Sequence, residues 1–195
     1  MRISAILVVT GASGSGKTTT VRALEARALP GVRCYYFDAV GVLAAGALER
    51  EFGSPEGWQA VTTRAWLDRL AANPDSADVY VLDGQTRPSF VRSAVERVAT
   101  ALVRVVLLDC TAHTRHARLA GPREQPELSN QRMDCWAAYL RGQADALELP
   151  VIDTTNLGID AAVDALIVHV ECLRTERAAA EQQAGAARLD AGRSA

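Results

Sequence analysis

Eight residues near the amino terminus have the types and spacing of a loop that binds phosphate. Residues 11–18 read G-A-S-G-S-G-K-T, which fits the pattern G-x-x-x-x-G-K-[ST]. An apolar run precedes this pattern and a helix-forming run follows it, which is the order strand, loop, helix. Glycines let the backbone approach an anion closely, and N–H groups at a helix start point toward it. The pattern therefore predicts a site for a nucleoside triphosphate.

Individual side chains in and near this loop have separate expected tasks. We expect Lys17 to reach the β- and γ-phosphates and the Thr18 hydroxyl to bind Mg²⁺. A second Mg²⁺ ligand is predicted at Asp83, because the apolar run 79–82 closes on this acid as a Walker B strand does. The loop residues predicted to bind the nucleotide are Gly11, Ala12, Ser13, Gly14, Ser15, Gly16, Lys17, Thr18 and Thr19.

Apolar runs alternate with helix-like runs along the chain. The expected strands are 3–9, 32–37, 79–82, 102–108 and 149–152. The expected helices are 16–29, 41–52, 57–71, 88–100, 111–119, 128–147 and 158–174. This alternation predicts an α/β protein with a five-stranded parallel sheet flanked by helices on both faces.

Four expected strands end on or just before a carboxylate, at Asp38, Asp83, Asp109 and Asp153. Ligands of parallel sheets collect at the carboxyl ends of the strands. For Asp38 and Asp83 we favour a functional role, whereas capping of the following loop accounts for Asp109 and Asp153 at least as well.

Arginines cluster between the fourth expected strand and the long helix that follows it. Phosphoryl transfer needs cations around the transferred group. Arg118 and Arg123 flank a Gly-Pro break, which favours this role for them. Arg132 and Arg141 are expected on a solvated helix face.

Taken together, these motifs resemble those of the P-loop kinases of small molecules and nucleotides, such as adenylate, gluconate and shikimate kinases and chloramphenicol phosphotransferase. Residues 83–87 read D-G-Q-T-R, similar to the D-G-x-x-R of adenylate kinases. Residues 118–123 read R-L-A-G-P-R and resemble the R-L-x-x-x-R that begins their lid. Residues 126–131 are similar to a segment of gluconate kinases, and 151–156 to the strand and loop that hold adenine. The resemblance covers about residues 1–172.

The resemblance implies a nucleoside-monophosphate-kinase-like fold with a short lid. It implies that Arg118 stacks on adenine and that Arg123 contacts phosphates, while the loop with Thr154 and Thr155 holds the base. It also implies that Asp38 binds the acceptor hydroxyl and acts as general base, although an N-cap for the next helix would explain this residue too. The expected catalytic set is Lys17, Asp38, Arg118 and Arg123, and the expected acceptor-binding set is Asp38, Gln85 and Arg87.

The length of 195 residues suits one domain. We expect a P-loop kinase domain over 1–174, with acceptor-binding helices at 38–72, a lid at 111–132, and a flexible or helical tail over 175–195 that buries no face. No run is long enough to span a membrane and no cysteine pair has a C-x-x-C spacing, so we expect a cytoplasmic protein with free thiols. A monomer and a homodimer both remain open.

The function predicted from the sequence is an ATP-dependent kinase. It would move the γ-phosphate of ATP, bound with Mg²⁺, to a hydroxyl of a small polar metabolite, antibiotic, nucleoside or nucleotide. The alternatives are a polynucleotide 5′-hydroxyl kinase and a non-kinase ATPase or regulatory nucleotide-binding protein. A net charge of −2 and 5% aromatic residues disfavour a nucleic-acid partner. Residues 41–72 carry no clean match to a nucleotide-monophosphate pocket, so the acceptor and the choice of ATP over GTP stay open.

Overall fold

The computed structural model describes residues 3–40, 52–72, 74–97, 101–121 and 123–193. Its elements are β1 (Ser4–Thr10), α1 (Lys17–Ala26), β2 (Val32–Tyr36), the 3-10 helix η1 (Phe37–Val40), α3 (Pro55–Ala71), β3 (Val79–Asp83), α4 (Pro88–Val95), β4 (Ala101–Asp109), α5 (Ala112–Ala120), the 3-10 helix η2 (Pro126–Leu128), α6 (Gln131–Ala146), β5 (Val151–Asp153) and α7 (Ile159–Arg193). The helix expected at 41–52 lies, apart from its last residue, outside the described residues. In the described part of the chain, no helix is long and apolar enough to cross a membrane.

All five strands are parallel and lie in the order β2-β3-β1-β4-β5, which confirms the predicted fold class. The central strand β1 is buried along its whole length. Asp83, the last residue of β3, pairs with Val9 of β1 on one side and with Tyr36 of β2 on the other. This register brings the loop after β1, the end of β3 and the turn after β2 to one edge of the sheet.

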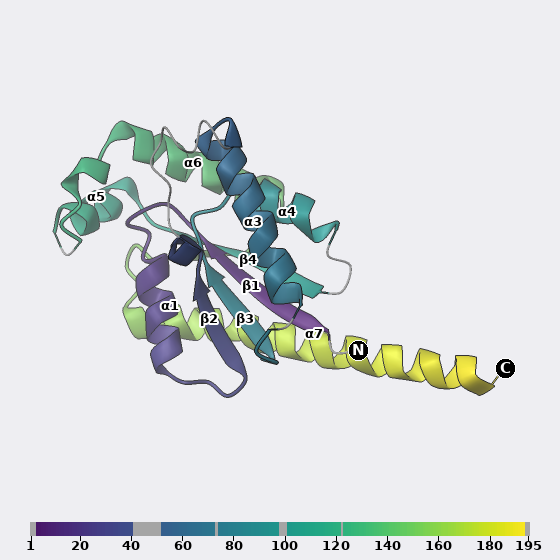
Figure 1. The fold of residues 1–195 in the computed structure, drawn as a ribbon. Coiled ribbons are helices and arrows are strands. Elements are labelled where there is room, and N and C mark those ends of the chain that lie inside the picture. Colours follow the sequence, from purple (N-terminus) through teal and green to yellow (C-terminus); the bar gives the residue numbers. More distant parts are fainter. Residues whose placement is uncertain (1–2, 41–51, 73, 98–100, 122, 194–195) are drawn as a thin grey trace.

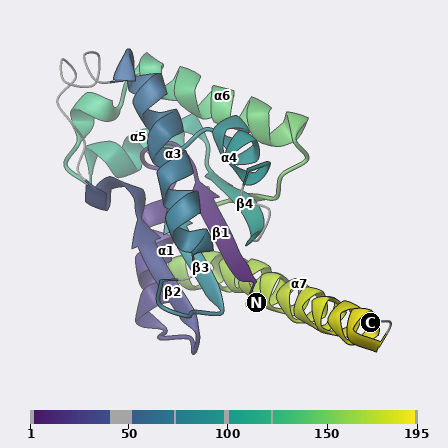
Figure 2. The same cartoon turned by 45° about the vertical axis from the view of Figure 1, so that its right-hand side comes forward.

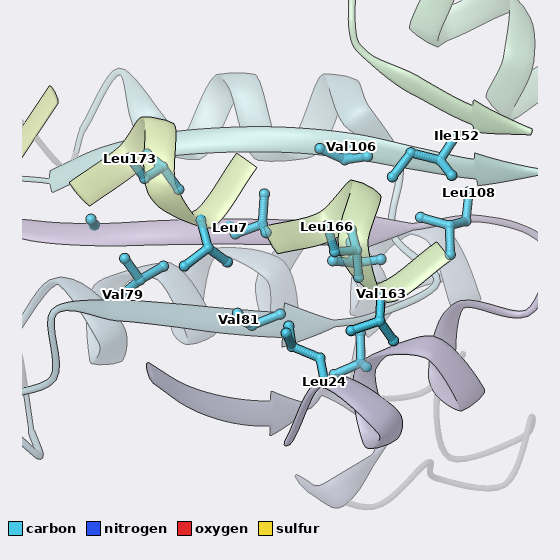
Figure 3. Close-up of a cluster of buried hydrophobic side chains, with 14 residues drawn as sticks. Leu7, Leu24, Val79, Val81, Val106, Leu108, Ile152, Val163, Leu166 and Leu173 are labelled. Carbon is cyan, nitrogen blue, oxygen red and sulfur yellow. The ribbon is translucent and has the colours of Figure 1, made fainter. Parts of the chain in front are cut away.

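Helices cover both faces of the sheet, as Figures 1 and 2 show. Because side chains alternate across a strand, Leu7 and Val9 of β1 pack with α1 and α7 on one face, while Ile6 and Val8 pack with α3 and α4 on the other. Figure 3 shows the first of these cores, in which α7 lies across the sheet. Helix α6 packs against β4 through Leu107, beside the phosphate-binding loop.

Polar side chains and prolines set the starts of the helices on the site side. Oxygens of Ser54, Thr111 and Asn130 accept hydrogen bonds from the backbone N–H three residues later, at 3.0, 3.3 and 3.0 Å. Pro55 and Pro88 occupy the first turns of α3 and α4, where the missing N–H costs nothing. The Asn130 cap explains why α6 begins three residues later than the predicted start at 128.

Helix α7 continues well beyond the boundary expected at residue 174. Its first turns past that point pack on the sheet: Arg177 is 7% exposed and donates to the Asp78 carbonyl at 2.9 Å and carboxylate at 3.0 Å. Glu181 accepts a hydrogen bond from the Ile3 N–H at 3.0 Å. The expectation that residues after 174 bury no face is therefore wrong for these turns, because their partners come from distant parts of the chain. The last part of α7 projects away from the sheet (Figures 1 and 2).

Replacing Arg177 by alanine should lower the free energy of unfolding by about 2–3 kcal/mol, because hydrogen bonds from a buried cation are lost and the Asp78 groups lose their donor. Urea unfolding followed by circular dichroism measures this change. The control is Arg64→Ala, which removes an exposed ion pair with Asp68 and should cost about 0.5 kcal/mol or less. Equal losses in the two variants would contradict the anchoring role of Arg177.

Candidate active site

The loop between β1 and α1 is held in shape by contacts with α5 and with the segment after β3. Gly14 has φ of 82°, and a Cβ there would lie 2.8 Å from Cγ of Arg115. A side chain at this position would therefore be both strained and without space. The Ser13 hydroxyl donates a hydrogen bond to Oε1 of Gln85 at 3.2 Å. These contacts form the cradle in which residues 11–19 are predicted to bind phosphate.

Two opposite charges are buried at the base of this cradle. Lys17, the only lysine in the sequence, is 8% exposed and stands in the first turn of α1. Burial lowers the pKa of Lys17, while the Asp83 and Asp38 carboxylates act to raise it and Arg123 acts to lower it. Asp83 is 5% exposed, and burial raises its pKa against the opposing effect of Lys17. The structure thus brings the predicted residues Lys17, Asp38, Asp83 and Arg123 into one electrostatic group.

The surroundings of Asp83 fit the predicted Mg²⁺ site. The Thr18 hydroxyl forms a hydrogen bond with the Asp83 carboxylate, which opposes the burial effect on its pKa. Oδ1 of Asp83 is buried and has no hydrogen-bond partner among the described residues. A buried oxygen of this kind is costly unless a cation or water binds it. A carboxylate oxygen beside a hydroxyl is a donor set that Mg²⁺ accepts.

Arg118 lies against the phosphate-binding loop and the end of β5. Its guanidinium donates to the Thr154 hydroxyl at 2.9 Å, to the Thr154 carbonyl at 2.6 Å and to the Gly14 carbonyl at 3.4 Å. The Thr154 hydroxyl in turn donates to the Ser15 carbonyl at 2.8 Å. These bonds connect the predicted residues Arg118 and Thr154 to the loop. The hydroxyl of Thr155, also predicted for the nucleotide, accepts from the Thr111 N–H at 3.0 Å instead.

A cavity of about 250 Å³ opens beside Arg118, between the loop and the start of α7. Its wall is polar on the side of the loop and apolar on the side of α7. The lining residues are Gly14, Gly16, Thr19, Thr20, Arg118, Arg123, Thr154, Leu157, Ile159 and Ala162. A slot with one cationic plane and one apolar wall suits a flat, neutral ring such as a nucleobase.

Two of the strand-end carboxylates cap loops. Oδ1 of Asp109 accepts a hydrogen bond from the Cys110 N–H at 2.9 Å. Oδ1 of Asp153 accepts one from the Thr155 N–H at 2.8 Å, and hydrogen bonds from Thr155 lower the pKa of Asp153. Two interpretations, capping and a functional role, were left open for Asp109 and Asp153. Their contacts support capping.

Asp38 is exposed in η1, at the edge that also carries the loop and Asp83. Phe37 beside it packs closely on Gly84, where a Cβ would lie 2.8 Å from Cβ of Phe37. The tight contact places the turn after β2 against the end of β3. The alternative role for Asp38, an N-cap of the helix expected after it, concerns partners outside the described residues.

Gln85 and Arg87 are held by Gln59 of α3, a residue that the sequence did not single out. Nε2 of Gln59 donates to the Gln85 carbonyl at 2.6 Å, and its Oε1 accepts from Nη1 of Arg87 at 2.5 Å. The Arg87 guanidinium lies 4.9 Å from the ring centre of Trp136 and 5.7 Å from that of Tyr139. No local pattern marks this surface, because the two rings stand on a helix that also carries the buried residues Ala137, Leu140 and Ala144.

Arg115 and His116 connect α5 to α6. Arg115 is buried and donates to the Cys110 carbonyl at 3.3 Å and to Oδ1 of Asp134 at 2.5 Å. Nε2 of His116 contacts the same carboxylate oxygen at 2.9 Å, and its Nδ1 contacts the Ser129 hydroxyl at 2.7 Å. Arg115 thus packs against the loop at Gly14. Arg123 is exposed, and among the described hydrogen bonds its side chain donates only to Oε1 of Gln125, at 3.2 Å.

No family model matches the sequence, and no curated protein matches it. Solved structures do match. A gluconokinase from Sinorhizobium meliloti is 18% identical with a TM-score of 0.59, over 90% of this chain and 97% of that one. A shikimate kinase from Acinetobacter baumannii in complex with shikimate is 19% identical with a TM-score of 0.54, over 89% and 94%. A deoxyadenosine kinase from M. mycoides with bound dATP is 10% identical with a TM-score of 0.54, over 85% and 99%. The chain therefore has the fold of the P-loop kinases.

Proposed function

We propose that the protein is an ATP-dependent phosphotransferase that moves the γ-phosphoryl group of ATP to a hydroxyl of a small polar metabolite, antibiotic, nucleoside or nucleotide. The observation that carries this proposal is the buried Lys17 opposed by Asp83 and Asp38 at the end of a glycine-rich cradle. A cation for the phosphates, a carboxylate for Mg²⁺ and a carboxylate for the acceptor hydroxyl, at one sheet edge, are groups that phosphoryl transfer requires.

On the donor side, the cradle binds the phosphates and the cavity beside Arg118 takes the base. The backbone N–H groups at the start of α1 and the Lys17 ammonium hold the β- and γ-phosphate oxygens. Thr18 and Asp83 would hold Mg²⁺, which neutralises phosphate charge when it is bound. Arg118, fixed by Thr154 and Gly14, lies over one face of the base.

On the acceptor side, Asp38 orients the hydroxyl and removes its proton as the oxygen attacks the γ-phosphorus; the bond from this phosphorus to the β,γ-bridging oxygen breaks and ADP leaves. Gln85 and Arg87 bind the remainder of the acceptor. Lys17 and Arg123 stabilise the negative charge on the transferring group, and closing of residues 111–132 over the site excludes water. Most of the rate enhancement then comes from positioning and charge rather than from covalent chemistry.

The decisive experiment is a transfer screen from ATP across small hydroxylated metabolites, nucleosides and antibiotics, with phosphorylated products detected by mass spectrometry. A 5′-hydroxyl oligonucleotide and a reaction without acceptor are included. A phosphorylated small molecule supports the proposal. Transfer only to the oligonucleotide, or ATP hydrolysis that no small molecule alters, would overturn it.

Replacing Lys17 by alanine should abolish transfer, since the buried ammonium is the cation that contacts the transferred phosphoryl group. The rate of product formation at saturating ATP measures this. Arg92→Ala, which removes one exposed positive charge from α4, should leave the rate within about twofold of wild type. Transfer at the wild-type rate in Lys17→Ala would show that the cradle does not hold the donor.

Replacing Asp38 by asparagine should lower transfer by about 10²-fold while ATP affinity stays within about twofold, because only the proton acceptor is lost. The two quantities are measured separately, by single-turnover kinetics and by calorimetry. Asp145→Asn, which neutralises an exposed carboxylate of α6 paired with Arg141, should change neither. A parallel fall of binding and transfer would assign Asp38 a structural role.

Replacing Asp83 by asparagine should raise the Mg²⁺ concentration that gives half-maximal ATP binding by about tenfold or more. ATP binding without Mg²⁺ should not weaken, because a negative charge beside the phosphates is removed at the same time. Titration of Mg²⁺ against a fluorescent ATP analogue measures both values. An unchanged Mg²⁺ requirement would exclude Asp83 as a ligand.

A further inference from the structure

The first half of β4 is an open edge of the sheet. On one side β1 pairs with residues 101–107 of β4, but on the other side β5 pairs only with residues 107–109. In the described part of the chain, no strand therefore covers the outer side of residues 101–106. Residues 101–105 are accordingly only half-buried, whereas the inner strands β1 and β3 are buried throughout.

The backbone groups on this edge can be assigned a direction. The Leu107 N–H donates to the Pro150 carbonyl at 3.0 Å, so the backbone polar groups of Leu107 point toward β5. The N–H and C=O of one residue point to the same side of a strand, and this side alternates along the chain. The N–H and C=O groups of Ala101, Val103 and Val105 therefore point outward, away from β1. They form a row of donors and acceptors that a further strand can pair with.

The features that usually protect a sheet edge from pairing are missing here. Residues 101–106 read A-L-V-R-V-V, with no proline, no glycine and a single charge. That charge, on Arg104, forms an ion pair with Glu176 of α7 and so stands on one face of the sheet rather than across its edge. A regular, mostly apolar strand of this kind favours pairing with another strand.

A groove with a volume of about 820 Å³ runs along the open edge, and α4 lies beside it (Figure 2). On the α4 face of the sheet the groove is apolar, with Val103 and Val105 packed in the same core as α4. On the opposite face it is polar, with Arg104 and Glu176. An occupant that continues both faces is an extended strand with apolar side chains on one side and polar ones on the other. β4 itself has this pattern, so a second copy of the chain fits the groove.

The same edge determines how two copies would pair. An antiparallel pair related by a two-fold axis through Val103 places Val103 opposite Val103 and Ala101 opposite Val105, so that all outward N–H and C=O groups find partners. An axis through Arg104 would place two arginines opposite each other, which is unfavourable. An axis through Leu102 would leave Val105 unpaired. The axis through Val103 is therefore the favoured register, with Arg104 opposite Leu102.

Charges on α4 complement themselves across this axis. Arg92 and Glu96 are exposed, line the groove and stand one turn apart. Neither forms an ion pair within the described residues. A two-fold axis reverses the direction of α4 in the second copy, so Arg92 of each copy is brought toward Glu96 of the other. Opposite charges then meet twice across the interface, which favours this partner over an unrelated extended peptide.

We propose that the protein forms a two-fold symmetric dimer in which the open edges of β4 pair antiparallel and join the two sheets into one. The paired residues lie at the amino end of β4, whereas the candidate active site lies at the carboxyl ends of the strands. Both sites therefore stay open in the dimer, and Arg92 takes part in the interface without contacting a site.

The first measurement is sedimentation velocity of the full chain over a range of protein concentrations, from about 1 to about 500 µM. We expect the weight-average mass to rise with concentration from the mass of one chain toward the mass of two. A mass that stays at one chain over the whole range would overturn the proposal, whatever other ligand the groove accepts.

Charge reversal tests whether α4 lies at the interface. Arg92→Glu and Glu96→Arg should each raise the dimer dissociation constant about tenfold, because each brings like charges together across the axis. The double variant restores opposite charges and should return the constant to within about threefold of wild type. Arg132→Glu is the matched control, because it reverses an exposed charge on α6 outside the groove and should change nothing. Single variants that dimerise as the wild type does, or a double variant that is not rescued, would overturn the proposed interface.

Cysteine substitutions test the register, in a chain that carries Cys135→Ser because Cys135 is exposed. On mild oxidation Val103→Cys should form a disulfide between two copies, since the paired Cα atoms lie about 5.5 Å apart. Val105→Cys should not, since it lies about 13 Å from the same residue of the second copy. Mass spectrometry of proteolytic peptides identifies the linked residues. Linking through residue 105 as readily as through residue 103 would overturn the antiparallel register.

Discussion

The buried pair of charges at the end of the central strands constrains everything around it. β1 and β3 end side by side, because Val9 pairs with Asp83 in the parallel register. Lys17, in the helix that follows β1, and Asp83 are both buried near these strand ends. Removing two charges from water is expensive, and their mutual attraction compensates only when further polar groups or ions satisfy them. The opposite pKa shifts of the two side chains, both caused by burial, reflect this cost. A fold that keeps such a pair gains a site already arranged for phosphate and a cation, at some expense of stability.

Different interactions stabilise the two halves of the candidate site, one around the glycine-rich loop and one around Arg87. The half around the glycine-rich loop is a network of hydrogen bonds, in which Arg118 connects Thr154 to the Gly14 carbonyl, and Arg115 of α5 packs against Gly14. The half around Arg87 depends on aromatic packing around one guanidinium, between α3, α4 and α6. If the proposed function holds, the first half binds a phosphate donor that is always the same, whereas the surface of rings and one cation can be adapted to different acceptors by few substitutions.

The sequence predicts the first half of this arrangement much better than the second. The glycine pattern and the apolar strands are local signals, so the strand-loop-helix unit around residues 11–19 and the parallel sheet could be predicted before the structure was known. The contacts of Gln59 and Trp136 arise only when three helices distant in the chain meet, and no local pattern marks them. For the same reason the sequence did not predict that Arg177 packs on the sheet. Its partner Asp78 lies about a hundred residues away, so nothing local indicated that the helix turns beyond residue 174 have contacts. Helix starts were predicted within a few residues, and caps such as Asn130 account for the differences.

Lys17 is the only lysine in the sequence, and this has a consequence for the chemistry of the whole molecule. All other Arg and Lys positions in the sequence are arginines, so the protein has a single ε-amine, and this amine is buried at the glycine-rich loop. Burial lowers the pKa of that amine, which enlarges its neutral, nucleophilic fraction at a given pH, while the surrounding cradle limits access to it. Acylating and aldehyde reagents therefore have one side-chain amine to modify in the molecule. If the proposed function holds, a bound triphosphate covers this amine, and the extent of its modification, read by mass, measures how much of the protein carries nucleotide without knowledge of the acceptor.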